Sequence, residues 1–291
     1  TRGSRKEFPA VAVIVAEAAT VTIYDGDDPD MPMWMVFEAS ATTDMLYGVF
    51  IATLTSVVMK NAQLATGATP YALNVIDFLQ DTGRFVNTSA SGSYLYKGSI
   101  SERNDNKDIV QDGYYDAIVN SAVNDVAMTV LPDAPIDPAT GIPVPTIAVA
   151  TDGGVSVIKD DGTVVDITAG AGSSYSGVSW IDITENYNLI FEQDSSSNPR
   201  AVFCIPIPSA DRTTQTNDGS ITDKVIMKFY ANGAHEPYPC FNGGGVVDAI
   251  GMAGDNQALR SESGDLTILE PNLTGPEQGK VAYVASTYNT G

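Results

Sequence analysis

The stretch TIAVATDGGVSVIKDDGTVVDIT, residues 146–168, constrains the fold more than any other part of this chain. Short runs of β-branched residues alternate in it with turns rich in Asp and Gly. The sequences Asp152-Gly153-Gly154 and Asp160-Asp161-Gly162 supply residues that tolerate positive φ in tight turns. No 3.6-residue hydrophobic period is present. The stretch therefore predicts three antiparallel strands joined by two tight turns.

The same order of strands and turns recurs along the chain. It returns in residues 11–37, 62–86, 187–207 and 249–269, and a further strand pair is expected around residues 117–131. Repeated meanders of about 40 to 50 residues are typical of propeller blades, which stack because a single small sheet cannot bury both its faces. The sequence thus predicts an all-β fold, a β-propeller-like array of short antiparallel meanders. A β-sandwich, which also has many short strands, is the alternative.

We expect one propeller-like domain over residues 1–291, cut from a longer polypeptide. Residues 132–145 contain several prolines, which lack an amide donor and favour extended backbone. We interpret this segment as an inter-blade linker on the surface.

Charge excludes some functions. The 291 residues carry a formal net charge of −21, which opposes binding to a nucleic-acid backbone and adhesion to an anionic membrane. No run of about 18 apolar residues indicates a transmembrane helix. At 43% hydrophobic residues the chain can still bury a core, and its charge favours solubility.

Catalytic motifs are scarce. The single histidine, His235, lies in a turn-rich stretch without a G-x-S-x-G motif, and pairing it with Cys240 leaves no third orienting group. Cys204 and Cys240 could form a disulfide or remain two buried thiols. We therefore predict no enzyme. A polysaccharide depolymerase with paired carboxylates stays open, because glycosidases need only two acids.

The sequence YDGDDPD is the candidate metal site. Its carboxylates, Asp25, Asp27, Asp28 and Asp30, have the hard oxygen ligands that Ca²⁺ prefers. The spacing does not match an EF-hand loop. The alternative is a hairpin turn that uses Asp and Gly for backbone reasons. Otherwise the sequence predicts no cofactor.

Several tyrosines lie beside Gly, Ser, Asp or Asn. Protein surfaces hold sugars by stacking an apolar sugar face on an aromatic ring while polar side chains bond the hydroxyls. The alternative is that these rings fill spaces between blades. The candidate ligand-binding residues are Tyr94, Tyr96, Tyr114, Tyr115 and Tyr175.

Residues 8–37, 124–167 and 281–291 resemble a recurring region of large bacteriophage structural proteins of the marine phage type. The most specific part of the resemblance is NDVAMTVLPDAPIDPATGIPVPTIAVATDGGVSVIKDDGTVVDI, residues 124–167. The resemblance implies a propeller-like segment of a virion protein, a tail fibre or tail-associated adhesin. It implies an extracellular virion location and other virion chains as partners, including copies of itself.

Together these observations predict a phage tail-associated module for host-surface attachment that binds glycans. The first alternative is a structural spacer of the virion without a ligand, and the second is the depolymerase. An attachment module should expose a cluster of aromatic rings, whereas a spacer should expose apolar surface for neighbouring chains.

Overall fold

The computed structural model describes residues 7–38, 53–70, 72–88, 92–105, 107–169, 175–195, 200–214, 225–229, 247–253, 256–261, 266–269 and 280–284. The chain divides into two compact units. The first is Thr1–Asp152 with Ser156–Val164, and the second is Gly153–Val155 with Val165–Gly291. The single domain expected from the sequence stays a prediction.

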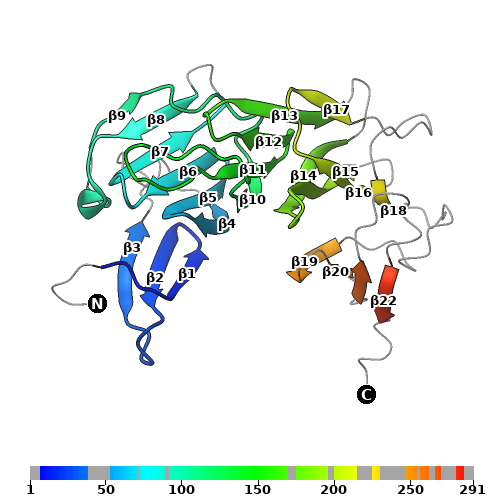
Figure 1. The fold of residues 1–291 in the computed structure, drawn as a ribbon, viewed down its shortest axis with the longest axis horizontal. Coiled ribbons are helices and arrows are strands. Elements are labelled where there is room, and N and C mark those ends of the chain that lie inside the picture. The colour runs from blue at the N-terminus through cyan, green and yellow to red at the C-terminus, as the bar shows by residue number, and fades with distance from the viewer. Residues whose placement is uncertain are drawn as a thin grey trace. The chain divides into compact units, whose positions relative to one another are not determined.

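The fold is all-β. In the described ranges the only helix is a single 3-10 turn, η2 (Ile100–Glu102), and the strands form five sheets. Most hydrogen-bonded neighbours are consecutive in the chain and antiparallel (Figure 1). This confirms the predicted propeller-like array of short antiparallel meanders. A β-sandwich would need two facing sheets instead.

The first unit holds two complete sheets. The three-stranded sheet has the order β1-β2-β3, with β1 (Ala12–Glu17), β2 (Thr20–Asp25) and β3 (Met33–Glu38). The six-stranded sheet has the order β4 to β9, with β4 (Thr53–Lys60), β5 (Gln63–Thr69), β6 (Ala72–Asp77), β7 (Thr82–Val86), β8 (Ser93–Tyr96) and β9 (Ile109–Gln111).

The other three sheets contain the remaining strands. One has the order β10-β11-β12-β13-β17, with β10 (Val123–Thr129), β11 (Thr146–Thr151), β12 (Gly154–Ile158), β13 (Val164–Ala169) and β17 (Arg212–Thr214). The next comprises β14 (Tyr175–Ile183), β15 (Asn188–Ser195), β16 (Arg200–Pro206) and β18 (Val225–Phe229). The last comprises β19 (Val247–Ala253), β20 (Asn256–Ser261), β21 (Leu266–Leu269) and β22 (Lys280–Val284). Strands β11, β12 and β13 match the three strands predicted over residues 146–168.

The six-stranded sheet is buried on both faces. Successive side chains of a strand point to opposite faces. Leu64 and Ile76 belong to a core cluster with the β1–β3 sheet, whereas Val75 belongs to a second cluster with residues of β10 and β11. Burial of each Leu or Ile contributes roughly 1.5–3 kcal/mol. Sheets of the first unit are thus stabilised by stacking, as the meander pattern predicted.

Strand β1 carries exposed valines on its outer face, which Val11 extends before the strand and Glu17 ends. Its inward residues pack into the core, whereas Val11, Val13 and Val15 are 56%, 36% and 39% exposed. A strand that faces water normally alternates apolar with polar residues. The three valines depart from that alternation, although Glu17 at the end of the same face is charged.

The β8–β9 loop contacts the edge strand β3, on the other side of the β1–β3 sheet from β1. Arg103 Nε and Asn104 Nδ2 both donate to the carbonyl oxygen of Val36 in β3. The Asn104 side-chain oxygen accepts from Glu38 N at 3.1 Å. Side chains from this loop therefore occupy backbone groups that an edge strand would otherwise present.

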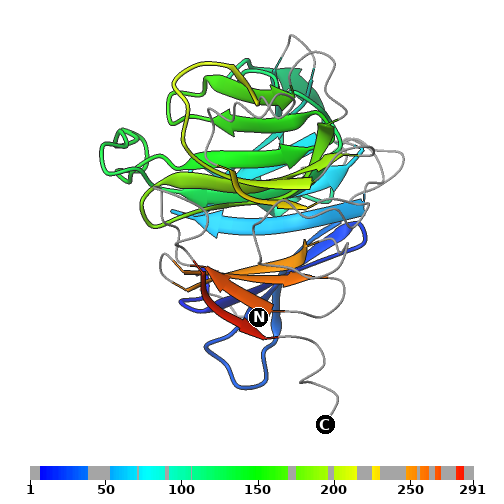
Figure 2. The same cartoon turned by 90° about the vertical axis from the view of Figure 1, so that its right-hand side faces the viewer.

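The interpretation of residues 132–145 as an inter-blade linker is wrong. They join β10 to β11, which are antiparallel neighbours in one sheet, so they form a hairpin loop and not a linker between blades. Figure 2 shows this green loop projecting from its sheet. Two side chains of the six-stranded sheet's turns anchor it: Gln80 Nε2 donates to Asp137 Oδ2 at 2.8 Å, and Asn61 Nδ2 donates to Pro143 O at 2.7 Å.

The strand pair expected around residues 117–131 is also only half right. Residues 123–129 form β10, but residues 117–122 are not a strand. They belong to the connection between β9 and β10, which also carries the site described next.

No helix of the described residues is long and apolar enough to span a membrane.

Candidate functional site

The β9–β10 connection, residues 112–122, crosses from the six-stranded sheet to the next sheet and carries two adjacent tyrosines. Tyr114 is 44% exposed, whereas Tyr115 is 6% exposed and lies in the core between the sheets. Gly113, with φ of +58°, precedes them. One ring therefore anchors the connection while its neighbour reaches the surface.

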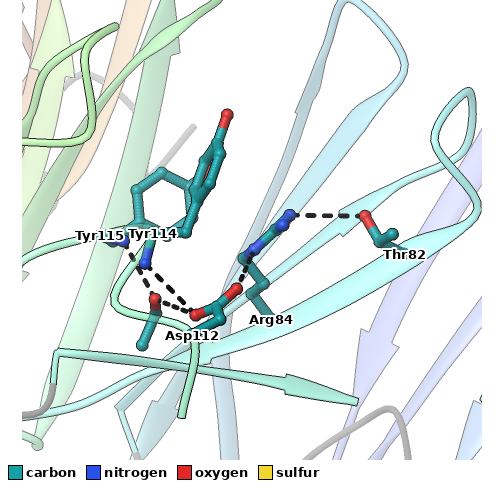
Figure 3. Close-up of polar contacts among 6 residues, drawn as sticks. Thr82, Arg84, Asp112, Tyr114 and Tyr115 are labelled. Atoms are coloured by element: carbon teal, nitrogen blue, oxygen red, sulfur yellow. Dashed lines mark hydrogen bonds and ion pairs between the residues drawn. The ribbon is translucent and has the colours of Figure 1, made fainter. Parts of the chain in front are cut away.

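A hydrogen-bonded network fixes the start of the connection. Arg84 Nε, from β7, donates to Asp112 Oδ2 at 2.7 Å (Figure 3). Ser93 Oγ, from β8, donates to Asp112 Oδ1 at 2.6 Å, and Tyr115 N donates to Ser93 Oγ at 3.0 Å. Asp112 thus ties two strands of the sheet to the chain segment that carries the tyrosines.

Partial burial strengthens this ion pair. The side chains of Arg84 and Asp112 are only 14% and 16% exposed. Burial is the largest single influence on the pKa of Asp112 and raises it, but hydrogen bonds from Ser93, Arg84 and Tyr114 N together with the Arg84 charge outweigh it. The net effect lowers the pKa of Asp112, so the carboxylate is charged at neutral pH.

The ring of Tyr114 is held on two sides. The Arg84 guanidinium carbon lies 4.0 Å from the ring centroid, a cation–π contact. The Tyr115 ring meets it edge-on, with centroids 4.8 Å apart and an interplanar angle of 87°. The exposed ring therefore has a defined orientation.

Two glycines let neighbouring turns approach the connection closely. A Cβ on Gly92 would lie 2.1 Å from Tyr115 O, and one on Gly162 would lie 2.3 Å from Tyr114 O. Both glycines have positive φ, +64° and +85°. Gly162 O also accepts from Asp116 N at 3.1 Å. The turn between β12 and β13 thus supports the tyrosines from the adjacent sheet.

Further hydrogen bonds hold the rest of the connection. Ile118 N donates to Asn87 O at 3.1 Å, and Val119 N donates to Ser156 Oγ at 2.9 Å. The connection is therefore an ordered platform whose exposed aromatic ring is Tyr114. Recognition residues commonly occupy loops that a rigid scaffold positions.

The other tyrosines predicted to bind a ligand do not join this platform as exposed rings. Tyr94 is half-buried, with its ring centroid 6.4 Å from that of Phe85. Tyr96 is 4% exposed, and its single hydroxyl hydrogen faces two acceptors, the carbonyl oxygens of Glu102 and Asp105, 2.7 and 2.9 Å from the hydroxyl oxygen. Burial, followed by the charges of Asp105 and Glu102, raises the pKa of Tyr96 to about 12.

The stacking role assigned to Tyr96 and Tyr115 is therefore wrong for those two rings, because packing hides them from solvent. The interpretation that rings fill spaces inside the fold applies to both. Tyr175 lies in β14, but the structure does not describe its side chain.

In the acidic turn, residues 25–31, the carboxylates accept hydrogen bonds from backbone N–H groups. Asp27 accepts from Ala10 N at 2.8 Å and from Val11 N at 3.1 Å. Asp25 accepts from Asp27 N, and Asp28 accepts from Asp30 N. In the described ranges, no three acidic, His or Cys side chains come together as metal ligands. These contacts support the hairpin-turn interpretation, and calcium binding here stays a prediction.

His235 and Cys240 lie outside the described residues. Cys204 is buried in β16.

Sequence reasoning did not find Arg84, Ser93, Asp112, Gly92 or Gly162 as parts of a site. The turn sequence containing Gly162 was recognised, but only as a turn. A usable signal was the order Asp-Gly-Tyr-Tyr at residues 112–115, in which an acid and a glycine precede two aromatic rings.

No protein family matches this sequence. No curated protein matches it either. Among solved structures, the Cps50 (Swd1) β-propeller domain of Myceliophteria thermophila is 11% identical, with 94% of this chain and 83% of that chain covered and a TM-score of 0.43. The RRP9 WD40 repeats are 8% identical, with 94% and 77% covered and a TM-score of 0.46. Hsv2 of Kluyvelomyces marxianus is 10% identical, with 94% and 81% covered and a TM-score of 0.38. The chain's own sheets define its propeller-like fold.

Proposed function

We propose that this chain is a host-surface attachment module of a bacteriophage tail-associated protein, and that it binds glycans at the Tyr114 platform. The exposed, oriented ring of Tyr114 is the observation that carries this proposal. A sugar ring presents an apolar face that stacks on such a ring. The phage context is supported by the resemblance of residues 124–167 to virion structural proteins.

The proposal narrows the sequence prediction. A cluster of exposed tyrosines was expected, but burial of Tyr96 and Tyr115 leaves Tyr114 as the contact surface of its pair. Tyr115, Asp112 and Arg84 then act as positioning residues. The location proposed for the protein is the virion, outside the cell, in contact with other virion chains.

A glycan array, followed by titration of the best glycan against the full chain, tests the proposal. Tyr114→Ala should abolish binding and leave the circular dichroism spectrum and urea midpoint nearly unchanged, because an exposed side chain contributes little to stability. Tyr187→Ala is the matched control, since Tyr187 is also exposed, at 36%, and lies elsewhere in the chain. Unchanged binding by Tyr114→Ala would refute the platform, and the absence of any bound glycan would refute glycan attachment.

A structural spacer is the second candidate, and the exposed valines of β1 favour it. Val11, Val13 and Val15 form an exposed apolar row, ended by Glu17, that suits packing against another chain. Mass measurement in solution tests this candidate. A spacer should associate in a concentration-dependent way, and Val13→Lys should weaken that association while Tyr114→Ala should not. A monomer at every concentration would count against self-association.

A further inference from the structure

We propose that the Tyr114 platform selects uncharged or amino-bearing carbohydrates and rejects acidic ones such as uronates, sialylated chains and sulfated chains. This inference rests on the proposed glycan attachment and adds the charge class of the ligand.

Among the described residues, the cation that touches the ring is already paired with an acid. Arg84 stacks on Tyr114 but donates its Nε to Asp112 at 2.7 Å, and its Nη1 lies 3.5 Å from Thr82 Oγ1. Because the pKa of Asp112 is lowered, the pair keeps both charges, and hence zero net charge, at neutral pH. An anionic ligand therefore meets no uncompensated positive charge from this arginine.

Acidic residues lie near the backbone of Tyr114, both along the chain and in the turn between β12 and β13. Asp116 lies two positions after Tyr114, and its backbone N–H bonds Gly162 O. Asp160 and Asp161 directly precede Gly162. A Cβ added to Gly162 would lie 2.3 Å from Tyr114 O, so this turn is close to the Tyr114 backbone. Consecutive Cα atoms are about 3.8 Å apart. The Cα atoms of these acids therefore lie within about one Debye length of the Tyr114 backbone at moderate salt.

The local balance of charge remains negative after the cations are counted. These segments contain four acids and two cations. The acids are Asp112, Asp116, Asp160 and Asp161, and the cations are Arg84 and Lys159. Hydrogen bonds from Thr163 lower the pKa of Asp161, so this acid stays charged as well. The whole chain adds the same sign, with a formal net charge of −21. These acids repel a negatively charged ligand at close range. Such repulsion excludes the wrong ligand more than it raises the affinity for the right one.

The same groups suit a neutral or amino sugar. Arg84 covers one face of the Tyr114 ring and the Tyr115 ring contacts it edge-on, yet the residue stays 44% exposed, so a ligand meets this exposed part. Carboxylates accept hydrogen bonds from sugar hydroxyls, and an ammonium group adds attraction to them. The exposed part of the Tyr114 ring then provides contact, while the acids decide which ligand charge is tolerated.

Three polysaccharide probes test the inference on the full chain. Dextran is uncharged, chitosan carries amino groups, and alginate carries carboxylates. At low salt we expect chitosan and dextran to bind at least roughly tenfold more tightly than alginate, and the difference to shrink in high salt because charges are screened. The double variant Asp116→Asn, Asp160→Asn should narrow the difference, whereas Asp133→Asn, an exposed acid in the 132–145 loop, should not.

The two proposals can fail separately. Tighter binding of alginate than of dextran, lost in Tyr114→Ala, would overturn the charge preference and keep glycan attachment. A preference that survives both high salt and the double variant would also overturn it, since shape would then decide the selection. Failure of the folded chain to bind any probe or array glycan would overturn the attachment proposal itself.

Discussion

The acidic turn and the β9–β10 connection contain similar residues and use them differently. In the acidic turn, Asp27 bonds the backbone of residues 10 and 11, and its neighbours bond the turn itself. In the connection, Asp112 bonds side chains of two other strands. The first set of carboxylates shapes a turn, whereas the second holds an exposed ring. The type of partner makes this difference: Asp27 bonds backbone N–H groups, whereas Asp112 bonds side chains of neighbouring strands.

The largest effect should come from Gly162→Ala. The added Cβ would meet Tyr114 O at 2.3 Å at a φ of +85°, so both strain and overpacking oppose it. We expect a loss of about 3 kcal/mol in the free energy of unfolding. Urea denaturation measures it.

Gly141→Ala is the control for backbone strain alone, since its φ is +73° and nothing lies within 4 Å of the new Cβ. It should cost about 1 kcal/mol. Equal losses in the two variants would show that the turn between β12 and β13 does not support the connection.

Asp112→Asn should come next, with a loss of about 2 kcal/mol at pH 7, because it removes charge-assisted hydrogen bonds from a partly buried site. The pKa of Asp112 is lower in the folded protein than in the unfolded chain. Its contribution is therefore complete above the unfolded pKa, near 4, and is lost as the pH falls through the folded pKa.

Urea midpoints measured from pH 7 downwards give this contribution directly. The difference between the natural chain and Asp112→Asn should narrow below about pH 4. A difference that is constant with pH would mean that the ion pair with Arg84 does not stabilise the fold.

Asp27→Ala should have a smaller effect, about 1 kcal/mol or less, because the lost acceptor is exposed and water can replace it. Asp27→Asn keeps one amide oxygen and should cost less than Asp27→Ala. Thermal unfolding compares them. A loss as large as that of Asp112→Asn would erase the contrast between the two acidic segments.

Calcium should have the smallest effect. If the acidic turn is stabilised by its own backbone contacts, millimolar Ca²⁺ and chelator should give the same melting temperature. A ligand that binds the folded state raises stability in proportion to the logarithm of its concentration. A rise that Asp28→Ala removes would restore the calcium site predicted from the sequence.

The meanders were predictable because their signals are local. Val155 and Val157 in β12 lie between two turns of Asp and Gly, and neighbouring strands pair across those turns. The role of residues 132–145 was not predictable from prolines alone. Prolines argue against a central strand, but they do not reveal that residues 123–129 pair with residues 146–151.

The site was predictable only in part, for the same reason. The polar sequence around Tyr114 indicated a loop with an aromatic residue. Arg84 lies 28 positions before Asp112, and Ser93 lies 19 positions before it. Pairing of β7 with β8 and of β8 with β9 brings them together, and no spacing rule encodes these registers. Burial of Tyr115 likewise depends on the adjacent sheet.

The loop that holds β3 has a consequence for how this protein behaves at high concentration. An uncovered strand edge is a template on which a second polypeptide can nucleate a fibril. Arg103 and Asn104 engage Val36 O, and Asn104 also engages Glu38 N, so an incoming strand would first have to displace them. Two side chains thereby block growth of a β-polymer from this edge of the sheet.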